Sequence, residues 1–155
     1  MRVLAQRVTH GVVRVAGERV GGTGPGLLLL VGIGRGDDES DLRWMAKKIA
    51  NLRIFPDDED RMNRSVLEVG GGILSVSQFT LYGDCRKGRR PSFVDAEDPS
   101  RAAPLHDQFV ELLREEGVRR VETGTFGASM QVELENDGPV TLWIESPSEG
   151  AEDRG

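Results

Sequence analysis

The stretch GGTGPGLLLLVGI, residues 21–33, decides the fold of this 155-residue chain. Its second half, residues 27–33, is a short apolar run that directly follows glycine-rich sequence. A run of this length after turn residues is typical of a strand that is buried on both faces. We therefore expect a central β-strand here, preceded by a turn at glycines 21, 22, 24 and 26. These glycines match neither of the glycine-rich phosphate-binding motifs, so a tight turn is the better interpretation.

Patterns on either side of this run predict more strands and two helices. The expected strands are residues 2–8, 12–16, 73–79, 130–134 and 140–144. The first helix is expected over residues 38–53, with Asp37 or Asp38 as its cap and Pro56 as its stop. One stripe at helical spacing is marked by Leu42, Met45, Ala46, Ile49 and Arg53, with Leu52 flanking it.

The second helix is indicated by Asp98-Pro99, an N-cap followed by proline at the first helical position, and Gly117 is expected to end it. A strand-rich chain with two inserted helices predicts an α+β fold. We expect curled sheets that form a barrel-like or sandwich core, with the two main helices packed outside. The length predicts a single domain, residues 1–146, and the acidic segment 147–155 is expected to be a disordered tail.

Composition excludes several classes of protein. No apolar run approaches the ~20 residues of a membrane span, and the N-terminus does not resemble a signal peptide. Cys85 is the single cysteine, which excludes an internal disulfide and a cysteine-based zinc cluster. We therefore expect a cytoplasmic protein that does not contact membranes. The net charge is −6, but residues 145–155 supply −3 of it (four acids, one arginine), so global charge does not exclude a nucleic-acid partner.

The stretch SVSQFTLYGDCRKGRRPSF, residues 75–93, carries the candidate chemistry. It places the polar side chains of Ser77, Gln78 and Thr80 at a strand end, beside the cations of residues 86–90. This arrangement is typical of a site for a charged substrate. Two simpler interpretations stay open: a strand end whose hydroxyls bond to neighbouring backbone, and a solvated charged loop.

No protein nucleophile is indicated. A hydroxyl nucleophile normally needs a base, and His10 and His106 are placed by no motif; the G-x-S-x-G elbow is also absent from the sequence. We therefore expect Ser77 and Thr80 to bind or position a substrate. The acidic run 57–60 lacks the spacing of a calcium loop, so we expect no metal and no cofactor.

Several segments together resemble the D-aminoacyl-tRNA deacylases of the DTD type. The resemblance covers residues 1 to about 146, and two of its motifs are long and specific. The matching segments are Ser77–Leu81, Arg90–Phe93, Asn136–Thr141, Arg53–Phe55, Met62–Asn63, Gly127–Ala128 with Met130, and Gln6–Val8. The chain departs from the family at His10-Gly11, at Cys85 and in its acidic tail, none of which touches the two main motifs.

The resemblance implies a homodimeric enzyme that hydrolyses the ester between a D-amino acid and the terminal adenosine of tRNA. It also implies activity on glycine carried by a non-cognate tRNA. In such an enzyme, Gly138-Pro139 of one subunit enters the partner's pocket as a cis peptide and selects against L substrates. The 2′-hydroxyl of the terminal ribose assists the attacking water, so no protein triad is needed.

The resemblance also assigns roles to residues of the pocket. Backbone N–H groups of Phe79 and Thr80 are expected to stabilise the oxyanion. The substrate-binding residues that we expect are Ser77, Gln78, Phe79, Ala102 and Met130. From charge alone, we expect Arg86, Lys87, Arg89 and Arg90 to contact tRNA phosphates, and we expect no DNA partner.

Two alternatives remain. One is a non-catalytic tRNA-binding module, which predicts salt-sensitive binding without ester cleavage. The other is a hydrolase of the same fold that mainly clears glycine or L-alanine from the wrong tRNA. An unaltered Gly138-Pro139 within Asn136–Thr141 favours strict selection of D substrates.

Overall fold

The protein is seen in a computed structural model that describes residues 1–147. Residues 148–155 lie outside the described residues, and with them nearly all of the predicted tail, so the division into domain and tail stays a prediction. None of the helices within residues 1–147 is long and apolar enough to cross a membrane. The elements in chain order are β1 (Arg2–Val15), β2 (Glu18–Thr23), β3 (Gly26–Gly32), α1 (Glu39–Asn51), β4 (Phe55–Pro56), β5 (Met62–Arg64), α2 (Val66–Val69), β6 (Gly72–Ser77), a 3₁₀ turn (Phe79–Tyr82), α3 (Pro99–Glu115), β7 (Val121–Thr123) and β8 (Gln131–Glu145).

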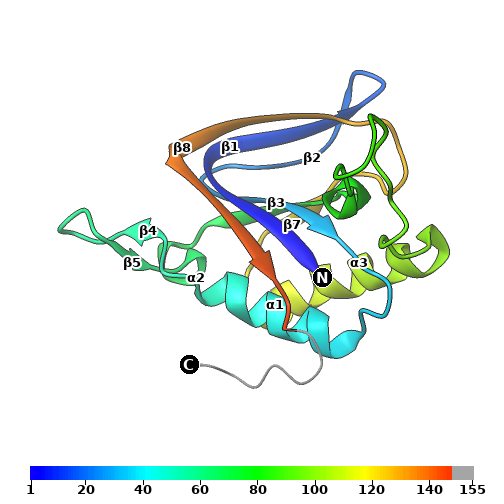
Figure 1. Ribbon diagram of the computed structural model, residues 1–155. Helices are drawn as coiled ribbons and strands as arrows, with labels where there is room; N and C mark the ends of the chain where they lie inside the picture. The colour runs from blue at the N-terminus through cyan, green and yellow to red at the C-terminus, as the bar shows by residue number, and fades with distance from the viewer. Residues whose placement is uncertain (148–155) are drawn as a thin grey trace.

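Six strands form one curled sheet in the order β2-β1-β3-β6-β7, with β8 paired to the other side of β1, and β4 and β5 form a separate two-stranded sheet (Figure 1). The sheet nearly closes into a barrel because β2 returns to β7. A Cβ on Gly21 would lie 2.1 Å from the carbonyl oxygen of Thr123, so only glycine permits this approach. Helices α1 and α3 lie side by side against the outside of the sheet (Figure 1). The predicted α+β fold, with a barrel-like sheet and two main helices outside, is confirmed.

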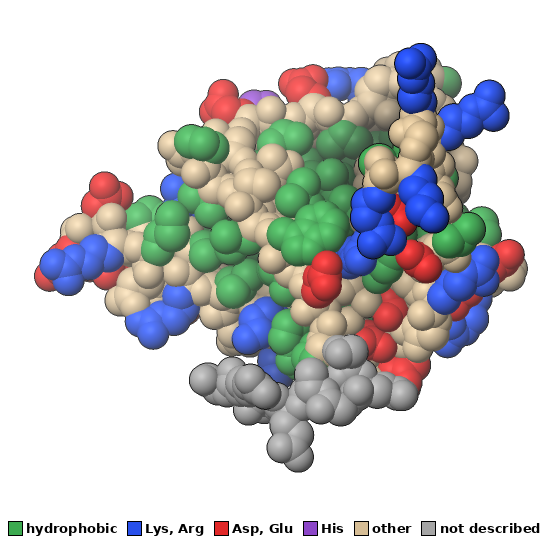
Figure 2. Space-filling model, viewed as in Figure 1, with side chains coloured by type: hydrophobic (Ala, Val, Ile, Leu, Met, Phe, Trp, Pro, Cys, Tyr) green, Lys and Arg blue, Asp and Glu red, His purple; other side chains and the backbone are tan. Residues whose placement is uncertain are grey.

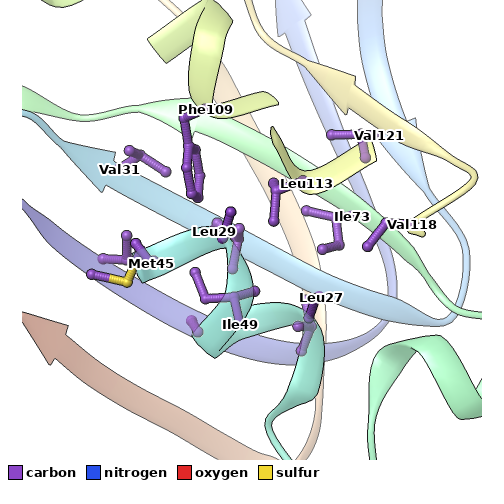
Figure 3. Packing of buried hydrophobic residues seen from close by; sticks show 14 of the residues in the cluster. Leu27, Leu29, Val31, Met45, Ile49, Ile73, Phe109, Leu113, Val118 and Val121 are labelled. Atoms are coloured by element: carbon purple, nitrogen blue, oxygen red, sulfur yellow. The ribbon is translucent and has the colours of Figure 1, made fainter. Parts of the chain in front are cut away.

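Strand β3 is buried on both faces, as its apolar run predicts. Leu27 and Leu29 are fully buried and belong to the large cluster beneath the helices, with Phe109 of α3 (Figure 3). Leu28, also fully buried, belongs to a second cluster with Val8 and other strand residues. The same strand therefore supports two separate apolar clusters, one on each of its faces.

Two predictions for the N-terminal strands are wrong. Residues 2–8 and 12–15 are parts of one strand, β1, because its pairing with β8 continues past His10 through an irregularity in register, and residue 16 lies beyond the strand. Gly21 and Gly22 lie in β2, and the chain reverses earlier, at Ala16 and Gly17, which both have positive φ. Of the predicted turn before β3, only a bend at Gly24-Pro25 is present. Gly21 and Gly22 permit close strand packing, which looks like a turn signal in the sequence alone.

The first helix is shorter than predicted. Helix α1 begins after the N-cap Asp38, whose side chain accepts a hydrogen bond from the Ser40 N–H, and it ends at Asn51. Arg53 therefore lies beyond the helix, and Pro56 lies in β4 rather than at the helix end. The polar segment after it is a β4–β5 hairpin, which projects from the body of the molecule (Figure 1).

The predictions for the second helix are confirmed at both ends. The Asp98 carboxylate accepts from the Ser100 N–H, Pro99 is the first residue of α3, and Gly117 follows the helix with a φ of 111°. The prediction of two separate strands over residues 130–134 and 140–144, by contrast, is wrong, because residues 131–134 and 140–144 both belong to the single strand β8. Strand β8 continues in one direction along β1 from Gln131 to Glu145, and residues between Asn136 and Thr141 bulge out of it.

Candidate active site

A cavity of about 550 Å³ opens where β3, β6, the start of α3 and the segment before β8 meet. Five of the sequence-predicted residues line it together: Ser77, Gln78, Phe79, Ala102 and Met130. They come from three segments that are distant in the chain. The other lining residues are Ile33, Arg35, Val76, Phe93, Ala96, Glu97, Asp98, Pro99, Phe126, Gly127, Ala128 and Val132.

The polar end of β6 is positioned by its parallel pairing with β3. The Gln78 N–H donates to the Val31 carbonyl at 2.7 Å, and the chain then turns sharply into the 3₁₀ turn. The prediction that this strand runs to Phe79 is therefore wrong by two residues, since β6 ends at Ser77. At the start of such a turn, the first N–H groups have no partner within the turn. Among the described residues, the N–H groups of Phe79 and Thr80 have no hydrogen-bond acceptor.

Tyr82, the last residue of the 3₁₀ turn, fixes the turn to the rest of the protein. Its ring is buried against Gly34, where a Cβ would lie 2.5 Å from the Tyr82 hydroxyl oxygen. The Arg2 guanidinium lies 4.3 Å from the centre of this ring and donates to the Leu81 carbonyl at 3.1 Å. Burial raises the pKa of the Tyr82 hydroxyl, so this side chain stays neutral. The turn is thus fixed on its inner side, whereas Phe79 and Thr80 on its outer side are exposed.

A buried polar pair lies next to the cavity wall. His106 is one helical turn beyond Ala102 on α3, and its Nε2 lies 3.0 Å from the Ser75 Oγ on β6. Both side chains are buried, and burial lowers the pKa of the His106 imidazole to about 4. The neutral pair therefore joins the helix and the strand that carry Ala102 and Ser77. It does not line the cavity, so it is not placed to act as a base.

A basic finger, residues 84–92, extends from the cavity mouth. Asp84 and Ser92 close its base through two backbone hydrogen bonds of 2.8 and 2.9 Å. The Arg86 guanidinium donates to the Asp84 carboxylate at 2.7 and 2.9 Å, and these bonds lower the pKa of Asp84 to about 2. Lys87, Arg89 and Arg90 are exposed and form no ion pair within residues 1–147.

The Gly138–Pro139 peptide bond is cis and lies in the bulge of β8. Asn136 closes this bulge, because its side chain accepts from the Val140 N–H at 2.7 Å and donates to the Thr141 hydroxyl at 3.0 Å. Arg7 holds it from β1 by donating to the Asp137 carbonyl at 2.9 Å. Neither Gly138 nor Pro139 belongs to the described residues that line the cavity of the same chain.

Sequence reasoning missed several of these residues. Phe126 and Val132 line the cavity, but no pattern in the sequence brings their segment to the end of β6. Phe93 and Arg7 belong to the motifs that match the family, but the sequence alone assigned no role to either residue. Arg7 also donates to the Ile54 carbonyl at 2.7 Å, a contact that depends entirely on the fold. No group of three or more His, Cys, Asp or Glu side chains in the described part of the chain is arranged to hold a metal ion.

The fold and the cavity define a class: a small α+β protein whose pocket lies beside unbonded backbone N–H groups and exposed cations. The family model described as D-Tyr-tRNA(Tyr) deacylase matches residues 4–145. The chain belongs to this family and is an enzyme of its hydrolase class. A protein of Chloroherpeton thalassium named D-aminoacyl-tRNA deacylase is 60% identical over 148 residues, covering 96% of this chain and 97% of that protein. A Desulfitobacterium hafniense protein of the same name is 61% identical over 146 residues, covering 94% and 97% of the two chains.

Two solved structures are also similar to this chain. One, named c-Myc DNA Unwinding Element Binding Protein, has a TM-score of 0.90 and 40% identity, and the match covers 96% of this chain and 100% of that one. The other, described as a probable eukaryotic D-amino acid tRNA deacylase, has a TM-score of 0.80. Its identity is 24% over 93% of this chain and 98% of the other, so it shows the fold alone.

Proposed function

We propose that the protein hydrolyses the ester of D-aminoacyl-tRNA and releases the free D-amino acid and tRNA. The observation that carries the proposal is the pair of unbonded N–H groups at Phe79 and Thr80, next to the cavity that Ser77 and Gln78 line. In ester hydrolysis, water adds to the carbonyl carbon and negative charge develops on the carbonyl oxygen. Two preorganised donors would stabilise that charge, and each such donor is typically worth about 3–4 kcal/mol.

The protein needs to supply no general base in this reaction. Neither histidine lines the cavity: His106 is buried beside Ser75, and His10 lies on β1. The 2′-hydroxyl of the terminal ribose would assist the attacking water, and the ribose 3′-oxygen would leave with the tRNA. Gln78 donates to the Thr80 hydroxyl, which supports a positioning role for Thr80 rather than a nucleophilic one.

The proposal includes a selector, Gly138-Pro139, supplied by a second copy of the chain. Its peptide carbonyls would bind the substrate's amino group, so that the side chain of an L-amino acid would clash with the protein. Glycine has no side chain and would be accepted, including glycine on a non-cognate tRNA. Two observations support this selector. Hydrogen bonds from Arg7 and Asn136 fix the bulge that carries it, and Gly138-Pro139 does not line the cavity of its own chain.

A homodimer would also cover the open face of the molecule. Strand β8 pairs only with β1 among the described strands, and most of its side chains are at least partly exposed. Trp143 and Val132 of this strand are 49% and 36% exposed. Figure 2 shows hydrophobic side chains gathered in the middle of the face that β8 crosses. Exposed apolar surface of this kind is typical of a protein interface.

The basic finger is proposed to contact tRNA phosphates. Lys87, Arg89 and Arg90 are exposed and unpaired within the described residues, whereas the charge of Arg86 is largely balanced by Asp84. We therefore expect Lys87, Arg89 and Arg90 to contribute more than Arg86. Their contribution should weaken as salt increases.

The direct test is deacylation of D-Tyr-tRNA, L-Tyr-tRNA and glycyl-tRNA, measured side by side with the purified protein. The expected result is release from the D and glycyl substrates and none from the L substrate. Binding of tRNA without release from any of them would support the alternative, a non-catalytic binding module. Release of glycine alone would support the enzyme with a shifted substrate.

Pro139→Ala is expected to weaken discrimination between D and L substrates and to leave the fold intact, because residue 139 is exposed in the bulge. The measurement is the ratio of kcat/KM for D-Tyr-tRNA and L-Tyr-tRNA, with circular dichroism as the control for folding. An unchanged ratio would remove the selector from the proposal.

Thr80→Ala is expected to keep substantial activity on D-Tyr-tRNA, because only the backbone N–H of this residue is proposed to act on the oxyanion. The loss should stay within about tenfold, the order expected when one neutral hydrogen bond of about 1 kcal/mol is removed. Complete inactivity in a folded variant would restore the nucleophile interpretation.

We also retain the cytoplasm as the predicted location, which fractionation of cells would test.

A further inference from the structure

We propose that Phe79 and Phe93 form a stacking site for the nucleotide that precedes the terminal adenosine of the substrate. The protein would then bind a single-stranded 3′ end of at least two nucleotides, and not the terminal nucleotide alone. This inference rests on the proposed function, since it concerns the same cavity and the same substrate class.

The first argument is the exposure of the aromatic pair. The side chains of Phe79 and Phe93 are 57% and 37% exposed, and the neighbouring Val94 is 66% exposed. The two rings contact each other edge to face, with centroids 5.1 Å apart and planes at 73°. Both rings line the cavity, so this apolar surface lies at its mouth. Large exposed apolar side chains in a group mark a binding surface rather than ordinary protein surface.

The second argument is that Phe93 is held in place before any ligand binds. On one side, Ser92 forms two backbone hydrogen bonds with Asp84. On the other side, the Phe93 carbonyl accepts from the Ala96 N–H at 3.1 Å. A Cβ on Gly83 would lie 3.0 Å from the ring, which shows how closely the backbone supports it. A ring that is already ordered loses little conformational entropy when a base stacks on it.

The third argument is the charge next to the pair. The basic finger begins at Asp84, two residues after the end of the 3₁₀ turn, and ends at Ser92, directly before Phe93. Both rings therefore flank the base of a loop whose exposed cations are Lys87, Arg89 and Arg90. Aromatic rings beside a cationic track are the usual means of binding single-stranded nucleic acid, with bases on the rings and phosphates on the cations.

The test is a series of D-tyrosyl esters of increasing length: adenosine, the dinucleotide CA, the trinucleotide CCA, and whole tRNA. Each base stacked on an aromatic ring is worth about 1–3 kcal/mol, so kcat/KM should rise about 5-fold to 150-fold between adenosine and CA. Phe93→Leu should lose this gain, because leucine packs against Phe79 but offers no aromatic face. Phe93→Tyr should keep the gain. Arg89→Ala should weaken the reaction of whole tRNA more than it reduces the gain from adenosine to CA, because whole tRNA offers many phosphates to the finger and CA offers one.

The outcomes separate this inference from the proposed function. If none of the four esters is cleaved, the proposed function fails. If they are cleaved but CA is no better than adenosine, or if Phe93→Leu keeps the gain, only the stacking site is overturned. If Phe93→Leu keeps the gain but changes the sedimentation of the protein, the aromatic pair is covered by a second copy of the chain, and the stacking site is again overturned.

Discussion

The two sides of the sheet differ in how completely their apolar surface is covered. Beneath α1 and α3, Leu27, Leu29 and Phe109 are fully buried in one continuous cluster (Figure 3). On the side that β8 crosses, Trp143 and Val132 remain exposed, and hydrophobic surface is visible in Figure 2. The helical side is complete within one chain, whereas the β8 side carries the cavity and the bulge at Gly138-Pro139 and is left open. The difference separates the residues that stabilise the fold from those available for partners and substrate.

The largest expected effect is on the helical side. Phe109→Ala removes a fully buried ring from the cluster below α3, and we expect it to lower the free energy of unfolding by about 3–5 kcal/mol. Urea unfolding of wild type and variant at the same protein concentration measures the change. A loss below about 1 kcal/mol would contradict the view that this side holds the fold together.

The next effect concerns pH and the buried pair of His106 and Ser75. The pKa of His106 is about 4 in the folded protein and 6.5 in the unfolded chain, so below pH 6.5 the unfolded chain binds a proton that the folded protein does not. The contribution of neutral His106 to the free energy of unfolding is therefore fully present above pH 6.5. It is lost as pH falls to about 4, and the loss is roughly 3 kcal/mol in total. His106→Gln should remove most of this loss in urea unfolding compared at pH 7 and pH 4.5. An identical pH dependence in both proteins would contradict the prediction.

The smallest effect on stability is expected on the β8 side. Trp143→Ala should change the free energy of unfolding by less than about 1 kcal/mol, because the ring is 49% exposed. It should weaken the proposed dimer, since exposed aromatic residues on an open face are typical interface anchors. Sedimentation at several protein concentrations measures this. Val69→Ala, which removes a 40% exposed side chain from α2, is the matched control and should leave the dimer unchanged. Equal dimerisation of both variants and wild type would show that Trp143 lies outside the interface.

The sequence alone predicted those helices and strands that are specified by residues next to one another in the chain. The run at Leu27–Ile33 predicted a strand buried on both faces, and Asp98-Pro99 predicted the start of α3. The glycines before that run were predicted to form a turn, and this was wrong for Gly21 and Gly22, because each of them contacts a residue far away in the chain. Gly21 is needed for close approach to Thr123, and the Gly22 N–H donates to the Glu122 carboxylate 100 residues away in the chain. Such a contact leaves no periodic pattern in the sequence.

The residues of the candidate site likewise include some that the sequence predicts and others that only the fold brings to the cavity. The motif at Ser77–Leu81 was visible in the sequence, and the structure brings its first three residues to one cavity with Ala102 and Met130. Phe126 could not be placed there, because only the path of the chain between β7 and β8 carries it to the cavity. The prediction of two separate strands over residues 130–134 and 140–144 was wrong for a similar reason. The pairing of both halves of β8 with the long strand β1 decides the direction of the chain.

The central claim is that the open side is completed by a second copy, so the selector should act between subunits. Subunit mixing tests it most directly. The active partner is Pro139→Ala, expected to cleave both D-Tyr-tRNA and L-Tyr-tRNA. The other partner is a cavity-filled variant such as Ala102→Phe, first shown to be folded, dimeric and inactive, which still carries Gly138-Pro139.

In mixed dimers, the open cavity of the Pro139→Ala chain would receive the intact selector of the inactive chain. We therefore predict that an excess of the inactive variant suppresses cleavage of L-Tyr-tRNA and preserves cleavage of D-Tyr-tRNA. If cleavage of the L substrate is unaffected although mixed dimers have formed, the selector does not act across the subunit interface and the central claim is wrong.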